Sequence, residues 1–348
     1  MSFLGGEELK KNKLFFSGLI GASLGLYFLF HNQSENIFIE EELLLEENTK
    51  KQNINKEEFF LVTSDQLPLA LTIVRPVLRP IEAVVQIVHG ILEHRKRYLD
   101  FAEFLAEHGF AVVISDNRGH GRSVDEQFPL GHMPGVDRMV EDQYEITRFI
   151  KKHFPEKPLY LYGHSFGSIL ARLYLQKHDD AITKLLLTGT VQYEKKAPLG
   201  LIVATVANKI AGERSFSWII KKLSDFGSKD KTWLTNSKEH LEKAQADPWM
   251  IPGYDNRGTM TIWEADYQLK KIKHFHCQNP ELPILSITGA EDSNITGGEK
   301  GLLNTENTLR AIGYRQVDML DLPNMKHEVL NEVDNQLVYQ LILNFFNQ

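Results

Sequence analysis

The sequence predicts an α/β fold with a mostly parallel central sheet flanked by helices. Three observations support this fold class. The chain has 348 residues, 42% of them hydrophobic and 24% charged, which is enough apolar mass for a folded core and excludes a disordered or disulfide-stapled protein. From Glu57 onward, short β-branched or apolar runs alternate with longer helical patterns, as expected for parallel strands joined by crossover helices. The alternation fails once, between Tyr193 and about Asn279, where the pattern is helical.

Each predicted strand is a short apolar or β-branched run followed by a loop. In chain order these runs are Leu69–Val74, Val84–Val88, Ala111–Ser115, Leu159–Tyr162, Leu185–Leu187, Ile284–Ile287 and Gln316–Leu320. The predicted helices are longer segments with apolar residues at helical spacing: Tyr98–Glu107, Asp137–Phe154, Ile169–Lys177, Asn304–Ile312 and Val333–Phe346. We interpret residues 193–279 as a helical cap inserted into a domain that spans residues 57–348, with a separate domain as the alternative.

The amino-terminal region has a different composition. Residues 14–30 carry no charge and are just long enough to span a bilayer as a helix, so they are predicted to be a transmembrane anchor. Three lysines precede this segment and none follows until Lys50, which predicts a cytoplasmic segment at residues 1–13 and a catalytic domain on the outer side. A cleaved signal peptide, or a helix that packs on the protein or lies at the membrane interface, is the alternative. Residues 31–56 are predicted to be an acidic linker.

Charge and cysteine content exclude several classes of partner. The formal net charge is −7, from 39 basic and 46 acidic residues, so the chain lacks the basic surface that a nucleic-acid backbone requires. Cys277 is the single cysteine, which excludes an intrachain disulfide and a thiolate-rich metal site.

The strongest chemical motif is Gly163-His164-Ser165-Phe166-Gly167, a G-x-S-x-G sequence. It follows the predicted strand Leu159–Tyr162 and precedes a helical pattern, which is the setting of a nucleophile elbow. Gly163 and Gly167 would allow the sharp turn, because neither has a Cβ atom in the way. The motif therefore predicts Ser165 as a catalytic nucleophile.

A serine nucleophile needs a histidine base and a carboxylate that orients it, and with this motif they follow the serine as acid and then histidine. His327 lies in the loop after the last predicted strand and is the predicted base, in preference to His178, His240, His274 and His276. Asp292 follows the strand Ile284–Ile287 and is the predicted acid. Its neighbour Glu291 is the alternative, because spacing does not separate the two.

Acyl transfer also needs two backbone N–H groups to stabilise an oxyanion. Phe166, directly after the nucleophile, is the first predicted donor. Ile91 is the second, because the strand Val84–Val88 opens into the loop His89-Gly90-Ile91-Leu92-Glu93-His94, where Gly90 would allow close backbone approach. His89, Glu93 and His94 are suitable metal ligands, but we expect a hydrogen-bonded loop here.

These motifs together resemble the α/β-hydrolases of the monoacylglycerol lipase and lysophospholipase group. The resemblance covers residues 57–348 and rests on four motifs: His89-Gly90-x-x-Glu93-His94-x-x-Arg97-Tyr98, Asp116-x-x-Gly119-His120-Gly121-x-Ser123, the elbow, and Lys326-His327-Glu328 with Asn331-Glu332. It implies an α/β-hydrolase fold and a site shaped by His89, Gly90, Glu93, His94, Arg97, Gly163 and Gly167. The segment before residue 57 lies outside the resemblance.

The predicted function is a membrane-associated serine hydrolase that cleaves lipid esters, either monoacylglycerol or lysophospholipid, through an acyl-enzyme. An apolar cap sequence around Leu199–Ala204, together with the predicted anchor, favours a lipid ester as substrate. The mechanism requires neither a metal nor an organic cofactor. The alternatives are an aminopeptidase or a thioesterase on the same fold, or a membrane-tethered binding protein without catalysis.

Overall fold

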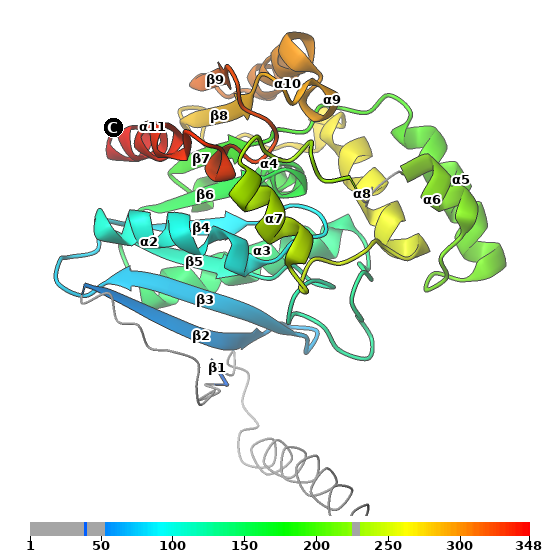
Figure 1. Ribbon diagram of the computed structural model, residues 1–348, viewed down its shortest axis with the longest axis horizontal. Helices are drawn as coiled ribbons and strands as arrows, with labels where there is room; N and C mark the ends of the chain where they lie inside the picture. The colour runs from blue at the N-terminus through cyan, green and yellow to red at the C-terminus, as the bar shows by residue number, and fades with distance from the viewer. Residues whose placement is uncertain (1–37, 40–52, 225–229) are drawn as a thin grey trace, which may run out of the picture. The chain divides into compact units, whose positions relative to one another are not determined.

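The computed structural model describes residues 38–39, 53–224 and 230–348 of the chain (Figure 1). Within these residues one sheet has nine strands in the order β1-β2-β3-β5-β4-β6-β7-β8-β9. Their bounds are β1 Phe38–Ile39, β2 Ile54–Val62, β3 Pro68–Pro76, β4 Ala83–Val88, β5 Phe110–Ser115, β6 Leu159–His164, β7 Lys184–Thr188, β8 Ile284–Gly289 and β9 Val317–Leu322.

The sheet is parallel from β5 through β4, β6, β7 and β8 to β9, and antiparallel where β1, β2 and β3 join it. This confirms the predicted α/β fold, and each of the seven predicted strands lies within or overlaps an observed one. Parallel strands end at one common edge of a sheet. The loops after β4, β6, β8 and β9, which carry the candidate residues, therefore leave the sheet at the same edge.

Two strands were not predicted from the sequence. Strand β2 pairs with β3 along its whole length, from Ile54 opposite Pro76 to Val62 opposite Pro68. Its first half contains Asn55, Lys56 and two glutamates and is half-exposed, so the usual apolar signal of a strand is missing. It begins inside the segment that we predicted to be a linker, and the short β1 lies in that segment too.

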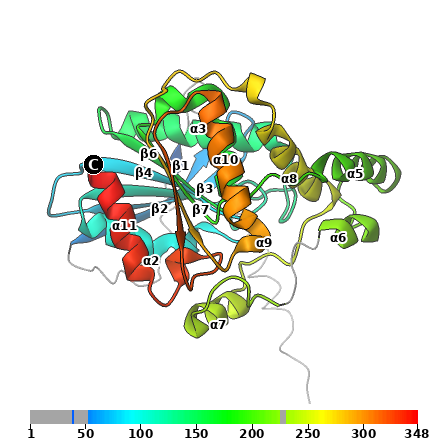
Figure 2. The same ribbon diagram turned by 90° about the horizontal axis from the view of Figure 1, so that it is seen from above.

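Helices cover both faces of the sheet (Figure 2). The side chains of β4 alternate between the two layers: Val84 and Val88 pack in one core cluster, whereas Val85 and Ile87 pack in the other. The first cluster includes residues of α3 Val136–His153, α4 Phe166–His178 and α10 Gly298–Ile312. The second includes residues of α2 Leu99–Glu107 and α11 Asn335–Asn347. All five helices overlap predicted ones; α10 begins six residues before the predicted start.

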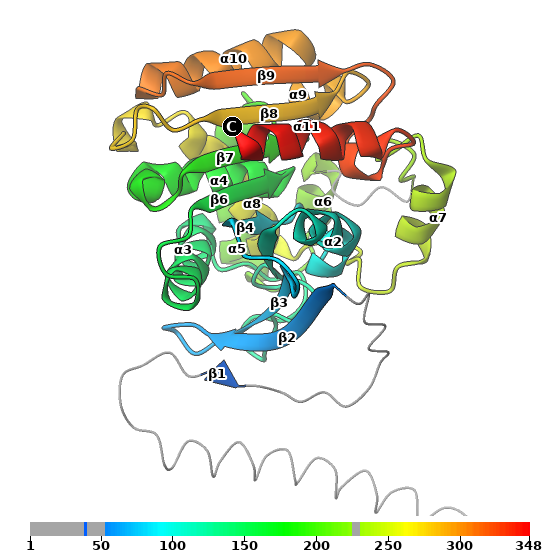
Figure 3. The same cartoon turned by 90° about the vertical axis from the view of Figure 1, so that its left-hand side faces the viewer.

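The insertion between β7 and β8 is helical in its described residues. It contains α5 Ala197–Ala211, α6 Trp218–Ser224, α7 Lys238–Ala246 and α8 Asn256–Leu269. Ala204, Ile220 and Trp263 form a small core that joins α5, α6 and α8. Ser237 and Asp255 cap α7 and α8, because each side chain accepts a backbone hydrogen bond from the first turn. Figure 3 shows α7 beside the carboxyl edge of the sheet. The remaining short helices are η1 Arg95–Tyr98, η2 Asp179–Ala181, η3 Ile272–His274, α9 Ser293–Thr296 and η4 Val329–Asn331.

The predicted single-pass topology, with a cytoplasmic amino terminus and an outward-facing catalytic domain, requires correction. Among the described residues no helix combines the length and the apolar character needed to cross a bilayer. The longest, α3, has 18 residues, but its exposed face is charged. This finding contradicts the predicted membrane localisation. Residues 14–30, the predicted anchor, lie outside the described residues.

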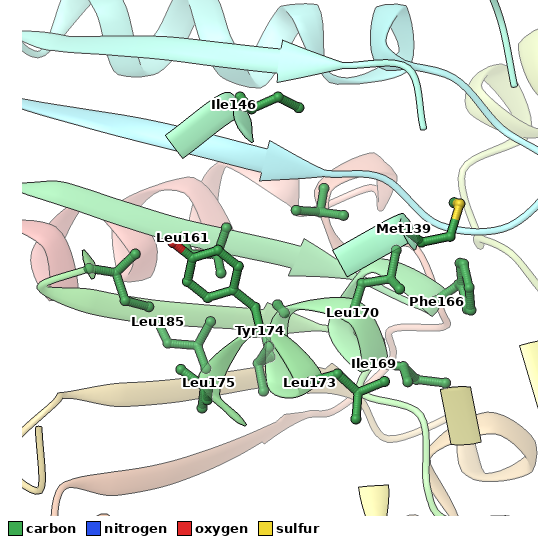
Figure 4. Close-up of a cluster of buried hydrophobic side chains, with 14 of the residues drawn as sticks. Met139, Ile146, Leu161, Phe166, Ile169, Leu170, Leu173, Tyr174, Leu175 and Leu185 are labelled. Atoms are coloured by element: carbon green, nitrogen blue, oxygen red, sulfur yellow. The ribbon is translucent and has the colours of Figure 1, made fainter. Parts of the chain in front are cut away.

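The core against α4 generates a prediction for stability. Leu170 is completely buried among Leu161, Leu173 and their neighbours (Figure 4). Leu170→Ala should lower the free energy of unfolding by about 2–5 kcal/mol, because it removes apolar contacts and leaves a cavity. Leu303→Ala on α10, where the side chain is 53% exposed, is the control and should change it by less than about 0.5 kcal/mol. Urea unfolding of both variants tests this, and equal changes would contradict it.

Candidate active site

The turn between β6 and α4 holds Ser165 in a strained conformation. Strand β6 ends at His164 and α4 begins at Phe166, which leaves Ser165 alone at the turn with φ 52° and ψ −119°. A Cβ on Gly167 would lie 2.0 Å from the carbonyl oxygen of Val88, and one on Gly163 would lie 2.3 Å from the carbonyl oxygen of Gly167. Only glycine fits at either place. A non-glycine residue at positive φ between a strand and a helix is the geometry of a nucleophile elbow.

Asp292 and His327 are brought together by the loops that follow β8 and β9. The distance between His327 Nδ1 and Asp292 Oδ2 is 2.7 Å, and both side chains are buried. The alternative acid Glu291 is exposed and accepts a hydrogen bond from Asn236 of the cap. Sequence spacing did not distinguish the two carboxylates, but their contacts differ: Asp292 contacts His327, whereas Glu291 contacts the cap. With Nδ1–H donated to Asp292, Nε2 is the nitrogen that can accept a proton.

The charge of Asp292 controls the protonation of His327. Burial alone would lower the pKa of the imidazole, but the adjacent carboxylate outweighs burial and raises the pKa above its ordinary value of 6.5. The His327 ring lies 4.9 Å from the ring of His164, the residue before Ser165. In the described residues His327 is hydrogen-bonded to Asp292 and the Ser165 hydroxyl makes no hydrogen bond to it. A hydrogen bond of this kind often forms only with substrate in place.

The two candidate oxyanion donors, Phe166 and Ile91, belong to segments that adjoin Ser165. Phe166 is the first residue of α4, so its N–H has no acceptor within the helix. The Ile91 N–H makes no hydrogen bond to the described part of the chain. A Cβ on Gly90 would lie 2.9 Å from Ser165 Cβ, so the loop that carries Ile91 packs directly against the serine. Two uncommitted N–H groups beside a strained serine suit the binding of an oxyanion.

The ring nitrogens of His89 are both engaged by the protein. Nδ1 donates to the Gly90 carbonyl oxygen at 2.8 Å, and Nε2 accepts from the Asn117 N–H at 2.8 Å. Burial holds the pKa of His89 well below its ordinary value, so the ring is neutral, as these bonds require. His94 is hydrogen-bonded to Asp247 of the cap at 2.8 Å. In the described parts of the chain no three His, Cys, Asp or Glu side chains are grouped to hold a metal ion.

Glu93 and Arg97 lie directly behind the loop that carries Ile91. Glu93 Oε1 accepts hydrogen bonds from the Gly90 N–H at 2.5 Å and from the Tyr98 hydroxyl at 2.7 Å. Arg97 contacts Glu93 through Nε at 3.2 Å and donates from Nη2 to Glu328. Burial, with a contribution from the Glu328 charge, outweighs the attraction of Arg97 and raises the pKa of Glu93 to about 7.

The loop after β5 is held by hydrogen bonds among its own residues and with Arg95 and Tyr254. Asp116 accepts from the backbone N–H groups of Arg95 and Arg122, and the Ser123 hydroxyl donates to the Asp116 carbonyl oxygen. His120 Nε2 accepts from the Tyr254 hydroxyl at 2.7 Å. Burial lowers the pKa of His120 to about 4, so this histidine is neutral and structural.

The cap is joined to both loops of the site through the main chain. The Ile251 N–H donates to the Leu92 carbonyl oxygen at 3.0 Å, and the Leu92 N–H donates to the Tyr254 hydroxyl at 2.6 Å. On the other side the Glu328 N–H donates to the Leu234 carbonyl oxygen at 2.8 Å. Sequence reasoning missed Tyr254 and the contacts of Glu328, because their partners lie 162 and 94 positions away along the chain and no local pattern marks them.

The family described as serine aminopeptidase, S33, matches residues 79–334. Monoglyceride lipase of Rattus norvegicus is 24% identical over 75% of this chain and 84% of its own length. Lysophospholipase L2 of Escherichia coli is 32% identical over 31% of this chain and 32% of its own. Relatives from Dictyostelium discoideum and monkeypox virus are matched over only 12% and 50% of their lengths.

Among solved structures, a thermostable carboxyl esterase of Bacillus coagulans superposes with a TM-score of 0.74 at 23% identity, covering 85% of this chain and 98% of the esterase. At this identity the likeness shows the fold alone. The family match covers most of the chain, and the chain therefore belongs to the serine aminopeptidase S33 family of α/β-hydrolases. It is related in sequence to monoglyceride lipase and lysophospholipase, as the sequence motifs predicted.

The raised pKa of Glu93 predicts how its replacement changes stability. Between the ordinary carboxyl pKa of 4.5 and the folded value of about 7, the folded chain holds a proton that the unfolded chain has lost. The contribution of Glu93 to the free energy of unfolding therefore falls as pH rises through this window. Glu93→Gln removes that contribution, so the Tm of the variant should rise relative to wild type between pH 5 and pH 8.

Differential scanning calorimetry at the two pH values measures this change. Glu299→Gln on α10, at an exposed position, is the matched control and should show a constant difference from wild type. The assignment of a protonated Glu93 fails if Glu93→Gln also differs from wild type by the same Tm at both values.

Proposed function

We propose that this chain is a serine hydrolase that cleaves the carboxylic esters of lipids, monoacylglycerol or lysophospholipid, through an acyl-enzyme. The observation that carries the proposal is the buried 2.7 Å contact between His327 and Asp292, at the edge of the sheet where the strained Ser165 lies. Residues 57–348 form the hydrolase domain in this proposal, and residues 193–279 form its cap.

In the first half of the reaction Ser165 Oγ attacks the ester carbonyl carbon. His327 Nε2 takes the hydroxyl proton, and the Asp292 carboxylate orients the imidazole and stabilises its charged form. The carbonyl oxygen becomes an oxyanion that accepts hydrogen bonds from the Ile91 and Phe166 N–H groups. When the tetrahedral species collapses, the proton on His327 passes to the leaving alcohol and an acyl-enzyme remains.

In the second half His327 acts as a base toward water. The water oxygen attacks the acyl carbon, the same two N–H groups stabilise the second oxyanion, and the released proton returns to the Ser165 oxygen as the fatty acid leaves. All proton transfers use groups of this chain. No step in this sequence draws on a further reagent besides water.

A lipid substrate is supported by the cap as well as by the relatives. Helix α5 exposes Leu199, Ile202 and Ile210, and α6 exposes Trp218. Apolar surface of this extent is uncommon on a helix unless it meets another apolar partner, such as an acyl chain. Trp233 of the cap also packs against His327, with 5.0 Å between ring centroids, and brings apolar surface next to the proposed base.

Ser165→Ala tests the proposed nucleophile. The variant should lose at least about 10⁴-fold in kcat, because no other group forms the acyl-enzyme, while its circular dichroism and Tm remain those of a folded chain. Wild type and variant are compared on monoacylglycerol, lysophosphatidylcholine, a short p-nitrophenyl ester, a thioester and a peptide amide. Serine-dependent release from either lipid supports the proposal. Cleavage of the thioester or amide alone would replace it with a thioesterase or an aminopeptidase, and no cleavage of any substrate would favour a binding protein.

Asp292→Asn tests the proposed orientation of His327. Because His327 acts as a base only when neutral, kcat/KM should fall as pH drops through its pKa, which the Asp292 charge raises. Removal of that charge should lower kcat by about 10³- to 10⁴-fold and move the acidic limb of the pH profile to lower pH. Glu291→Gln is the matched control and should leave the limb in place. A limb that shifts in Glu291→Gln and not in Asp292→Asn would reverse the assignment.

A further inference from the structure

Arg97 lies between two buried carboxylates that belong to different loops of the proposed site. Its Nε atom is 3.2 Å from Glu93 Oε2, and its Nη2 atom is 2.7 Å and 2.6 Å from the two carboxylate oxygens of Glu328. The three side chains are 9%, 6% and 7% exposed. Glu93 follows β4, whereas Glu328 is the residue directly after His327.

On one side this arrangement holds the loop that carries Ile91. Glu93 Oε1 accepts from the Gly90 N–H at 2.5 Å, so the carboxylate fixes the peptide plane immediately before Ile91. The Tyr98 hydroxyl donates to the same oxygen and restrains the carboxylate from behind. The direction of the Ile91 N–H therefore depends on where Glu93 lies.

On the other side the arrangement holds the loop that carries His327. The Glu328 carboxylate accepts from Arg97 and also from Asn331 Nδ2 at 2.9 Å, and its backbone N–H donates to Leu234 of the cap. Both the side chain and the main chain of Glu328 are thus restrained. Because His327 is the preceding residue, its backbone position is restrained with them.

Arg97 supplies the positive charge that contacts both Glu93 and Glu328. The Arg97 guanidinium is paired with Glu328 and lies beside Glu93, and the attraction of these two groups raises the pKa of Arg97 despite its burial. The small cavity beside Arg97 is otherwise lined by the uncharged side chains of Tyr98, Tyr162, His164, Leu330 and Asn331, and burial keeps His164 neutral. A buried carboxylate without a partner is strongly disfavoured, so loss of Arg97 would leave Glu328 unpaired and would remove the contact between the loops of Glu93 and Glu328.

We propose that Arg97 and Glu328 are positioning residues, which together set the oxyanion donor Ile91 relative to the base His327. This inference rests on the proposed function, and it assigns to Glu328 a role that its place in the sequence does not indicate. Neither residue touches the reacting atoms. Their contribution is to hold two loops, separated by more than 200 positions in the chain, in one fixed arrangement.

A double-mutant cycle in the full-length chain tests whether the pair acts as a unit. Arg97→Met, Glu328→Gln and the double variant are assayed on the p-nitrophenyl ester for kcat and KM. Each single variant should lose about 10- to 100-fold in kcat with KM changed by less than about threefold, because displacement of the donor or base affects the transition state more than binding. The double variant should be no slower than Arg97→Met alone. A loss in the double variant equal to the product of the single losses, or an unchanged kcat in either single variant, overturns the proposal.

Arg138→Met provides a control for loss of a partly buried ion pair. Arg138 on α3 pairs with Asp142 and Glu145, away from the four loops of the site. It should lose thermal stability and keep the kcat of wild type at 25 °C. A loss of kcat as large as that of Arg97→Met would assign both effects to general destabilisation and refute positioning.

Arg97→Lys keeps the test decisive if Arg97→Met does not fold. Lysine preserves the charge, but a single ammonium group lacks the planar fork that reaches both carboxylates. Its kcat should lie below that of wild type by about tenfold, with circular dichroism unchanged. If Arg97→Lys and Glu328→Gln both retain the wild-type kcat, the proposal is wrong regardless of the third variant.

Failure of this inference and failure of the proposed function give different experimental results. A fluorophosphonate reports the reactivity of Ser165 without requiring a lipid, and its labelling rate should fall in parallel with kcat. Wild-type chain that labels rapidly and cleaves the short ester but neither lipid would refute the lipid substrate and leave the positioning test intact. Wild-type chain that neither labels nor cleaves would refute both.

Discussion

The close approach of α4 to the end of β4 is the constraint on which the rest of the site depends. At Gly167 the backbone of the helix passes so near to the Val88 carbonyl that no side chain fits between them. Between β6 and this helix the chain turns at Ser165 alone, which takes a strained positive φ. Because β4 and β6 are neighbours in the sheet, the same contact brings the loop after β4 alongside the serine. The turn at Ser165 and the loop that carries Ile91 therefore both lie at this backbone contact.

Local features of the fold could be predicted from the sequence, and features that depend on distant partners could not. Strands such as Val84–Val88 and Leu159–Tyr162 are buried on both faces, so their composition alone marks them. Strand β2 escapes prediction because one edge of a sheet tolerates Lys56 and Glu58, and its pairing with β3 supplies the stability that its composition does not. The membrane topology was inferred from residues 1–50 alone, and the described helices contradict it.

In the candidate site, too, local motifs could be predicted and contacts with distant residues could not. Ser165 and its two glycines form a local motif, and the order of residues after it pointed to Asp292 and His327. Spacing left Glu291 open as the acid, and only the fold shows that its side chain turns outward to the cap. Glu328 belongs to the predicted His327 motif, but its contact with Arg97, which lies 231 positions earlier, could not be predicted from that motif. Contacts between loops that are distant in the chain therefore cannot be predicted from a single sequence.

The main-chain hydrogen bonds of the cap have a consequence for the evolution and engineering of substrate range. An inserted cap could be regarded as an interchangeable module that varies while the hydrolase domain stays constant. Here Leu234 and Ile251 are hydrogen-bonded to the backbone of the two loops that carry His327 and Ile91. A cap transplanted from a relative would bring different anchor points and would shift the loops beneath it. New specificity in this scaffold therefore arises more readily by exchange of side chains within the existing cap than by replacement of the cap as a whole.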